Sequence, residues 1–364
     1  MRSVPGDKKK TGGPAEELVN PEFTEGLLRW NRQSNSRQMP WKGEKDIYRI
    51  WLSEIILQQT RVEQGLKYYQ NFISRFPDIH TLAKAPEDEV YKYWEGLGYY
   101  SRCRNLIATA RYISNELGGK FPSDYHSILN LKGVGPYTAA AIASFAYNLP
   151  HAVLDGNVFR VLSRITGNDT PIDSAQGKKI FTELAMQLVP EGKAGIYNQA
   201  IMDFGATICK PVPVCASCFY SMSCIAYQSG RQELLPVKEK TIKQKSRWMH
   251  YFLLEHNSEL LIRKRGGRDI WKDLHEFLLI ETPGVIAGKE LAEIFEKQFG
   301  FLPVIHSKAE LRQKLTHQQI HFFLYRISVR EKIDVPGFTW VNTRDLEQYA
   351  FPKSLQQYLL DQQI

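Results

Sequence analysis

The chain has 364 residues, of which 43% are hydrophobic, and this size and composition indicate two packed domains. No apolar run reaches membrane-spanning length and the N-terminus lacks the apolar segment of a signal peptide, which argues against an integral membrane protein and a secreted one. The formal net charge of +8 favours an anionic partner, with nucleic acid as the first candidate.

Residues 1–20 have the composition of a disordered tail, with repeated Gly and Pro and no aromatic residue. From residue 21 to 228 apolar residues recur at spacings of three and four, as in Phe23, Leu27 and Trp30. We therefore expect an all-α domain over residues 21–228.

A helix expected after Asp46 carries an acid on its apolar face. Glu54 shares that face with Ile50, Trp51 and Ile55. Burial disfavours the charged form of a carboxyl, so the pKa of Glu54 should rise and the group could act as a general acid. The alternative is a partly exposed Glu54 at the edge of the stripe, paired with an arginine.

The segment LKGVGPYTAAAIASFAY, residues 131–147, predicts a tight turn that leads into a helix. Gly133 and Gly135 permit the turn, and Pro136 suits the first position of the helix. Exposed backbone N–H groups at such a turn bind phosphate, and the whole string has the pattern of a helix–hairpin–helix, which grips a DNA backbone. The alternative is a plain turn between two helices.

The segment VLDGNVFRVLSR, residues 153–164, places an acid before the next helix. Asp155 could merely cap this helix. One helix and a return loop separate it from Tyr137, however, so the chain can bring Asp155 back beside the hairpin.

Four of the five cysteines cluster with the spacing C-x5-C-x2-C-x5-C, at Cys209, Cys215, Cys218 and Cys224. Clustered thiolates in a chain without a secretion signal predict a metal site rather than disulfides. The ligand count suits either a tetrahedral zinc ion or an iron–sulfur cluster. The separate Cys103 is expected to be a small buried residue.

Residues 229–247 are polar and basic, as in a linker, and the pattern changes after them. Strands are expected in WMHYFLLEHN, SELLIRKR, HEFLLIE and HFFLYRISVRE, and a helix is expected in KELAEIFEKQFG, ending at Gly300. Residues 248–364 are therefore expected to form an α+β domain.

These motifs together resemble the endonuclease III superfamily of DNA glycosylases and, within it, the adenine-specific mismatch glycosylases of the MutY family. The segments that carry the resemblance are MPW at 39–41, YRIWLSEIILQQTRV at 48–62, WEGLGYYSRCRNL at 94–106, LKGVGPYTAAAI at 131–142, LDGNVFRVLSR at 154–164 and YNQAIMDFGATIC at 197–209. The resemblance implies a helix–hairpin–helix glycosylase domain with an iron–sulfur loop, followed by a Nudix-like domain.

The resemblance also implies a reaction. Such enzymes flip an adenine that lies opposite 8-oxoguanine or guanine out of double-stranded DNA and break its glycosidic bond. By this comparison Glu54 protonates the base, Asp155 stabilises the oxocarbenium-like sugar, and Tyr137 and Asn157 orient the two acids. Tyr137 occupies the position at which bifunctional relatives carry a Schiff-base lysine, so a monofunctional enzyme is expected.

Ten further residues match positions at which the family contacts DNA or the flipped base. They are Arg37, Trp41, Leu57, Gln59, Tyr99, Gly133, Gly135, Gln199, Thr316 and His317. Thr316 and His317 belong to LTHQQI, which resembles a lesion-reading Phe-Ser-His turn, with Leu315 and Thr316 in place of Phe and Ser. Because the C-terminal domain lacks the acidic cluster of Nudix hydrolases, we expect it to recognise 8-oxoguanine without hydrolysing a pyrophosphate.

The cysteines match the 4Fe–4S ligands of the family, although the first spacing is five residues rather than six. The resemblance further implies a monomer that binds no membrane and works in a bacterial cytoplasm, associated with the nucleoid. Two rival functions stay open: a thymine or uracil mismatch glycosylase of the same fold, and a non-catalytic iron–sulfur protein that binds DNA.

Overall fold

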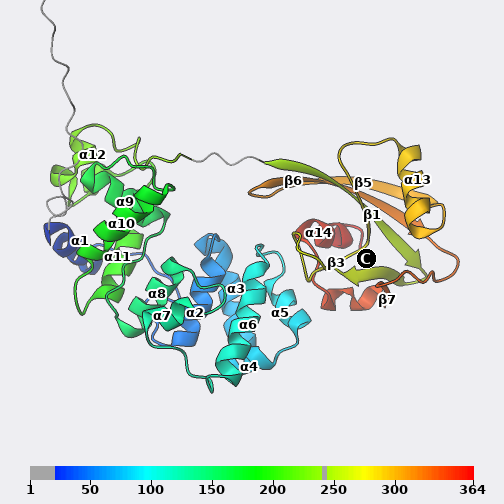
Figure 1. Ribbon diagram of the computed structural model, residues 1–364, viewed down its shortest axis with the longest axis horizontal. Coiled ribbons are helices and arrows are strands. Elements are labelled where there is room, and N and C mark those ends of the chain that lie inside the picture. Colours follow the sequence, from blue (N-terminus) through cyan, green and yellow to red (C-terminus); the bar gives the residue numbers. More distant parts are fainter. Residues whose placement is uncertain (1–20, 240–243) are drawn as a thin grey trace, which may run out of the picture. The chain divides into compact units, whose positions relative to one another are not determined.

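The computed structural model describes residues 21–239 and 244–364, and the tail expected at residues 1–20 lies outside this range. Contacts divide the chain, whose elements are labelled in Figure 1, into two compact units. The first unit holds the described parts of residues 1–55 and 121–240, and the second holds those of 56–120 and 241–364. The helices between residues 56 and 120 thus group with the C-terminal residues.

The first unit is helical throughout its described residues, and the all-α pattern expected after residue 21 is confirmed. Its elements are α1 (Pro21–Gln33), the start of α2 (Ile47–Leu57), α7 (Tyr125–Leu129), α8 (Pro136–Tyr147), α9 (Gly156–Thr166), α10 (Ala175–Leu188), α11 (Ala194–Thr207), η2 (Cys215–Ser217), η3 (Ser221–Ser223) and α12 (Ile225–Gln228).

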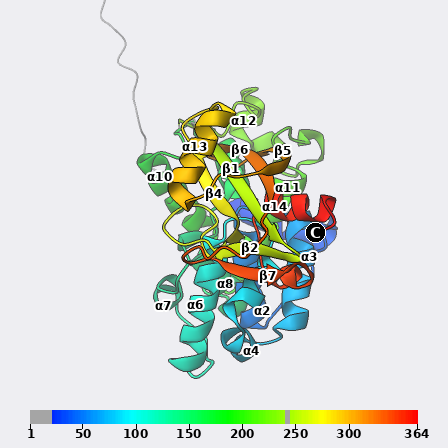
Figure 2. The same cartoon turned by 90° about the vertical axis from the view of Figure 1, so that its right-hand side faces the viewer.

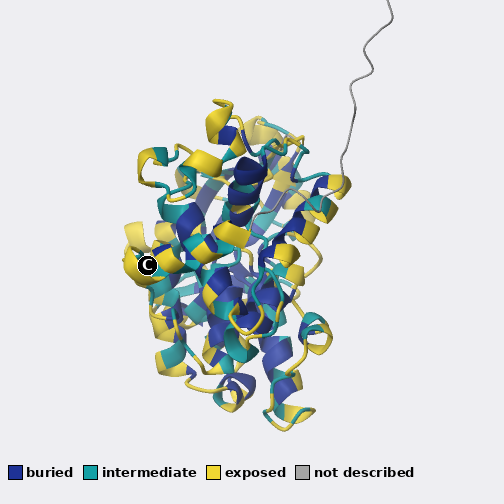
Figure 3. Cartoon of the chain, turned by 90° about the vertical axis from the view of Figure 1, so that its left-hand side faces the viewer, coloured by how far each residue is buried: buried dark blue, intermediate teal, exposed yellow. Residues whose placement is uncertain are grey.

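Amphipathic helices build the core of the first unit. Phe23, Leu27 and Trp30 are the buried residues of α1, as the spacing predicts, and they pack in one cluster with residues of α9 and α11. Figure 3 shows buried and exposed residues alternating along helices, as one-sided packing requires. This core fixes α8, α9 and α11, which carry most of the residues discussed below.

The second unit combines a group of helices with a mixed sheet. Its elements are α3 (Val62–Arg75), α4 (Ile79–Lys84), α5 (Glu87–Trp94), α6 (Ser101–Asn115), β1 (Lys245–His256), β2 (Glu259–Lys264), β3 (His275–Glu276), β4 (Leu278–Thr282), α13 (Gly288–Phe299), β5 (Ile305–Lys314), β6 (Gln318–Ser328), β7 (Thr339–Asn342), η4 (Thr343–Gln348) and α14 (Lys353–Asp361). No helix in the described residues is long and apolar enough to cross a membrane.

Strand β1 lies at the centre of the sheet. It pairs in parallel with β6 and antiparallel with β2 and β4, and the sheet order is β3-β2-β1-β6-β5, with β7 on β2 (Figure 2). Helix α13 packs Leu291 and Phe295 against Phe252 of β1. It ends at Gly300, which has a left-handed φ of 84°, as the sequence predicts.

The strands expected in the C-terminal domain are confirmed, with two differences. The segment HEFLLIE forms two short strands, β3 and β4, which pair with β2 and β1 respectively. Strand β1 begins at Lys245, inside the range 229–247 expected to be a linker. Strands β5 and β7 are additional to those expected; β5 lies at the edge of the sheet and is polar and mostly exposed, and β7 is only four residues long.

Candidate active site

Glu54 is a buried acid on the apolar face of α2. Asp46 caps this helix as predicted, accepting a 2.8 Å hydrogen bond from Tyr48 N. The Glu54 residue is 6% exposed and its carboxyl is hydrogen-bonded to the Tyr137 hydroxyl. The expected helical face is confirmed, and the alternative of a partly exposed, arginine-paired Glu54 is wrong.

The environment of Glu54 raises its pKa from about 4.5 to about 7. Burial is the largest cause, since it removes water from the carboxylate; the negative charge of Asp155 raises the pKa further. The hydrogen bond from Tyr137 acts in the opposite direction and limits the rise. Glu54 therefore holds a proton in a substantial fraction of molecules at neutral pH, which is the condition for a general acid.

This pKa predicts how stability depends on pH. The folded protein binds more protons than the unfolded chain between about pH 4.5 and 7, so Glu54 lowers the free energy of unfolding as pH rises through that range. Glu54→Gln should therefore be more stable than the wild type above pH 7 by up to about 3 kcal/mol, and the advantage should vanish near pH 4. Urea unfolding at both pH values measures the difference in the free energy of unfolding between Glu54→Gln and the wild type. A difference that is independent of pH would contradict the raised pKa.

The hairpin joins α7 to α8 as the sequence predicts. Gly133 has a φ of 80°, a left-handed conformation that favours glycine, and Gly135 is the exposed N-cap of α8. Pro136 is the first residue of the helix and places Tyr137 in its first turn. The hairpin thus positions the hydroxyl that contacts Glu54.

Asp155 both caps α9 and belongs to the site. It accepts 2.8 Å hydrogen bonds from Val158 N and from Asn157 Nδ2. Burial raises the pKa of Asp155, while these two hydrogen bonds lower it. Because the charge of Asp155 also raises the pKa of Glu54, the two acids interact electrostatically.

Arg160, which the sequence interpretation missed, connects Asp155 to the cysteine segment. Its Nη2 donates to Asn157 Oδ1 at 2.9 Å and to Gly205 O at 2.8 Å, and its Nε donates to Cys209 O at 2.8 Å. Asn157 is therefore fixed on both sides, by Arg160 and by Asp155. The spacing of Asn157 and Arg160 on one helical face was the available signal.

A second residue missed from the sequence is Asp203 on α11, which is fully buried. Its carboxylate accepts hydrogen bonds from Arg37 at 2.9 Å, from Lys42 at 2.9 Å and from Gln199 at 3.0 Å. Asp203 thus brings together two of the three residues expected to line the base pocket, Arg37 and Gln199. Trp41, the third, is buried, at 9% exposure.

The four clustered cysteines line one small cavity, together with Arg164. None of the five cysteines forms a disulfide, and Cys103 is buried as expected. Arg164 Nη1 donates to Cys209 Sγ at 3.4 Å and to Lys210 O at 2.6 Å. In the part of the chain that the structure describes, no three His, Cys, Asp or Glu side chains come close enough to hold a single metal ion.

The residues expected to insert into the base stack lie in the second unit, on two strained turns. Gln59 has a φ of 55° and Tyr99 a φ of 49°, uncommon values for residues other than glycine and often associated with functional sites. Both side chains are exposed, whereas the neighbouring Leu57 is half-buried. Arg102, buried beneath them, donates to Ile56 O at 2.7 Å and Gly98 O at 3.2 Å, which ties the two turns together.

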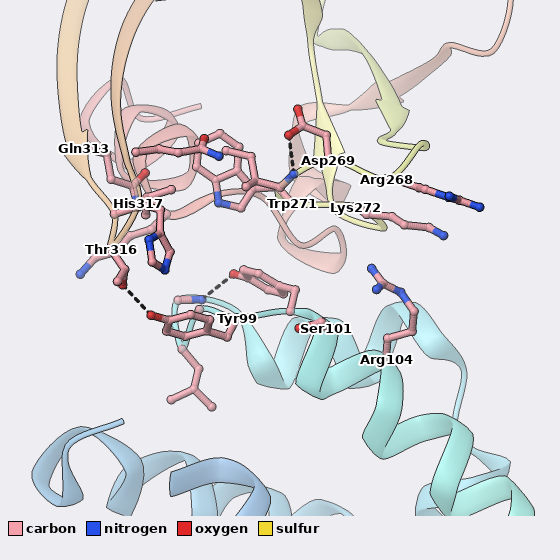
Figure 4. A pocket seen from close by; sticks show the side chains of 18 of the residues that line it. Tyr99, Ser101, Arg104, Arg268, Asp269, Trp271, Lys272, Gln313, Thr316 and His317 are labelled. Atoms are coloured by element: carbon pink, nitrogen blue, oxygen red, sulfur yellow. Dashed lines mark hydrogen bonds between the residues drawn. The ribbon is translucent and has the colours of Figure 1, made fainter. Parts of the chain in front are cut away.

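Thr316 and His317 lie in the turn between β5 and β6, which Leu315 N closes by donating to Gln318 O at 2.7 Å. The Thr316 and Tyr99 hydroxyls are 2.6 Å apart and hydrogen-bonded (Figure 4). The expected lesion-reading residues and the expected inserted tyrosine therefore meet in one pocket of about 730 Å³.

Comparisons with known proteins agree with this geometry. The family model described as "HhH-GPD superfamily base excision DNA repair protein" matches residues 52–191, and a NUDIX domain matches 250–361. The structure of a thermostable thymine-DNA glycosylase is similar with a TM-score of 0.52 and 32% identity over 57% of this chain and 95% of that one. An endonuclease III–DNA complex, at 19% identity and a TM-score of 0.50 over 58% of this chain and 99% of that one, shares the fold. The matching domain and the fold are thus those of a base excision DNA repair protein.

A relative that matches over nearly the whole chain identifies the family. Adenine DNA glycosylase of Buchnera aphidicola subsp. Schizaphis graminum is 31% identical over 348 residues, which cover 93% of this chain and 97% of the relative. The human adenine DNA glycosylase is 40% identical over 223 residues, covering 58% of this chain and 41% of the relative. The chain belongs to the adenine DNA glycosylase family. The expected fold class, a helix–hairpin–helix glycosylase domain followed by a Nudix-like α+β domain, is confirmed.

Proposed function

We propose that this chain is a monofunctional glycosylase that removes adenine mispaired with 8-oxoguanine or guanine. The observation that carries the proposal is the pair of acids in the first unit. The pKa of Glu54 is raised to about 7, in part by the negative charge of Asp155. The relatives that match over most of the chain bear the name of this activity. We further propose that it acts as a monomer on chromosomal DNA in a bacterial cytoplasm.

In the proposed reaction the adenine leaves the duplex and enters the site, because its glycosidic bond is unreachable in the stack. Glu54 donates its proton to the imidazole ring of the base, which makes adenine a neutral leaving group. The bond between C1′ and the base nitrogen then breaks, and the electron pair stays on adenine. A raised pKa suits this step, since the acid must be protonated near neutral pH.

Asp155 stabilises the positive sugar that remains, and Glu54, now ionised, accepts a proton from the water that attacks C1′. Asn157 and Arg160 hold the Asp155 carboxylate in place. Tyr137 supplies a hydroxyl and no amine, so the proposed reaction forms no Schiff base and does not cleave the strand. Arg37, Trp41 and Gln199 are proposed to line the base pocket, where Asp203 anchors two of them.

The test is base release from four duplexes that differ at one pair: A·8-oxoguanine, A·G, T·G and U·G. Under single-turnover conditions, adenine should be released from the first two, leaving an abasic site with an intact strand. Release of thymine or uracil instead would establish the rival function, for which the similar thymine-DNA glycosylase structure is the supporting observation. That structure covers only 57% of this chain, whereas the adenine relative covers 93%.

We infer that the four cysteines hold a 4Fe–4S cluster. They line one small cavity together, and four cysteine thiolates are the usual ligand set of such a cluster. The guanidinium of Arg164 beside Cys209 would offset part of the negative charge of the thiolates. The cluster would supply structure here, holding the segment that Arg160 joins to Asn157.

Iron content tests this assignment. The purified protein should be brown and should contain about four iron atoms per chain, since four cysteines are the usual ligand set of such a cluster. Cys218→Ser should lower the iron content, whereas Cys103→Ser should leave it unchanged. Stoichiometric zinc in a colourless, active protein would contradict the assignment.

The Tyr99–Thr316 hydrogen bond leads to a prediction about lesion choice. Thr316→Val keeps the shape of the side chain and removes its hydroxyl, so neither Tyr99 nor a guanine base can bond to it. The preference for A·8-oxoguanine over A·G should fall a few-fold to about tenfold, as expected for one lost hydrogen bond. Thr316→Ser is the control and should retain the preference; equal losses on both duplexes would mean that Thr316 does not read the lesion.

A further inference from the structure

The pocket of the second unit has two chemically different ends (Figure 4). Thr316 and His317 lie at one end, beside Tyr99, and the buried Trp271 forms part of the wall between the ends. Three cationic side chains, Arg104, Arg268 and Lys272, lie at the other end. The second end therefore has a strong positive charge for which the proposed chemistry has no use.

The carboxylates near this end are already occupied. Asp269, which also lines the pocket, uses both oxygens on Arg247, at 2.8 and 2.6 Å, and shares one with Arg265 at 2.7 Å. Asp273 accepts from Arg104 at 2.8 Å and from Tyr91 at 3.0 Å.

In the described residues, no ion pair involves Arg268 or Lys272. Both therefore keep a full charge available for a ligand, and both reach toward the same end of the pocket.

The loop that carries these two cations is held in one conformation. Trp271 and Asp273 have φ values of 60° and 71°, a left-handed conformation that is uncommon for residues other than glycine and, for a residue as bulky as tryptophan, persists only when the surroundings enforce it. Arg265 enforces them from inside the loop: Asp273 N donates to Arg265 O at 2.8 Å and Arg265 Nε donates to Ile270 O at 3.0 Å. Ordering the loop thus adds little to the cost of binding.

We propose that Arg268 and Lys272, which lie at the same end of the pocket as Arg104 of α6, bind a phosphodiester of the DNA strand that carries the guanine of the mispair. The inference rests on the proposed function, because that function places the guanine at the Tyr99–Thr316 end of the same pocket. A phosphate is the group that suits two unpaired cations on a rigid loop. The contact fixes the strand in register, so that Thr316 and His317 meet the base and not its neighbours.

Salt dependence of binding tests the site. Arg268→Gln with Lys272→Gln should reduce the slope of log affinity against log salt by about 0.9, the value for the one phosphate that both side chains contact. The control is Lys289→Gln with Lys297→Gln on α13, which removes the same charge from exposed positions outside the pocket and should change the slope little. The duplex carries 2′-fluoroadenosine opposite guanine to prevent turnover. Equal slopes for the two variants would overturn the proposal.

Methylphosphonate linkages replace a charged phosphate with a neutral group, and they show which DNA strand Arg268 and Lys272 contact. Placed near the guanine, one such linkage should weaken the wild type and leave the Arg268→Gln/Lys272→Gln variant nearly unaffected, because the contact is already lost. A response confined to linkages on the adenine strand, or none at all, would refute the assignment. Adenine release measured separately keeps the proposals distinct: a changed slope without adenine release would leave the phosphate site standing and the proposed function wrong.

Discussion

Glu54→Gln is expected to lower the single-turnover rate of adenine excision by about 10²–10⁴-fold, the usual contribution of a general acid. Glutamine has the same size and keeps a hydrogen-bonding group toward Tyr137, but it cannot donate a proton to the leaving base. Affinity for an A·8-oxoguanine duplex should stay close to that of the wild type, since Glu54 is buried and its loss removes no phosphate contact.

The matched control is Glu63→Gln, an exposed glutamate in the first turn of α3, which should excise at the normal rate. Equal thermal stability of the variant and the wild type near pH 4, where Glu54 is protonated in both the folded and the unfolded state, would show that folding is intact. Near-normal excision by Glu54→Gln would show that Glu54 is not the general acid of the reaction.

Asp155→Asn should slow excision by about 10²–10³-fold, the size of effect seen when one electrostatic stabiliser of a transition state is removed. Asparagine is as good an N-cap as aspartate, so α9 should keep its cap and the protein its fold. The loss would then be one of charge near the developing sugar cation and not one of structure.

Asp78→Asn gives the comparison, because Asp78 caps α4 in the same way, accepting from Thr81 N at 2.8 Å. That variant should be fully active and equally stable. If both variants excise normally, Asp155 is only a helix cap, which was the alternative open from its sequence.

Local patterns predicted much of this site because its main residues lie at defined positions of helices. The helical spacing around Glu54 predicts its burial, and burial is the main cause of its raised pKa. Glycine and proline predict the hairpin at Gly133 and Pro136, where φ and the helix start require them. The resemblance to the family then supplied the roles of Asp155 and Tyr137.

Residues that act through long-range contacts could not be predicted in this way. Asp203 lies among apolar residues of α11, and its partner Arg37 is 166 positions away in the chain. Arg102 reads as an ordinary basic residue of a helix, yet it is buried and joins the turns of Gln59 and Tyr99. Their pairing depends on tertiary packing, which the spacing of residues within one helix does not encode.

The pH dependence of excision tests the central claim most directly, that a buried and protonated Glu54 drives the release of adenine. With the pKa of Glu54 at about 7, the wild-type single-turnover rate should reach its maximum below pH 7 and fall about tenfold per pH unit above 7, as the proton of Glu54 is lost. The small residual rate of Glu54→Gln should show no such fall. A wild-type rate that stays constant to pH 9 would contradict the account.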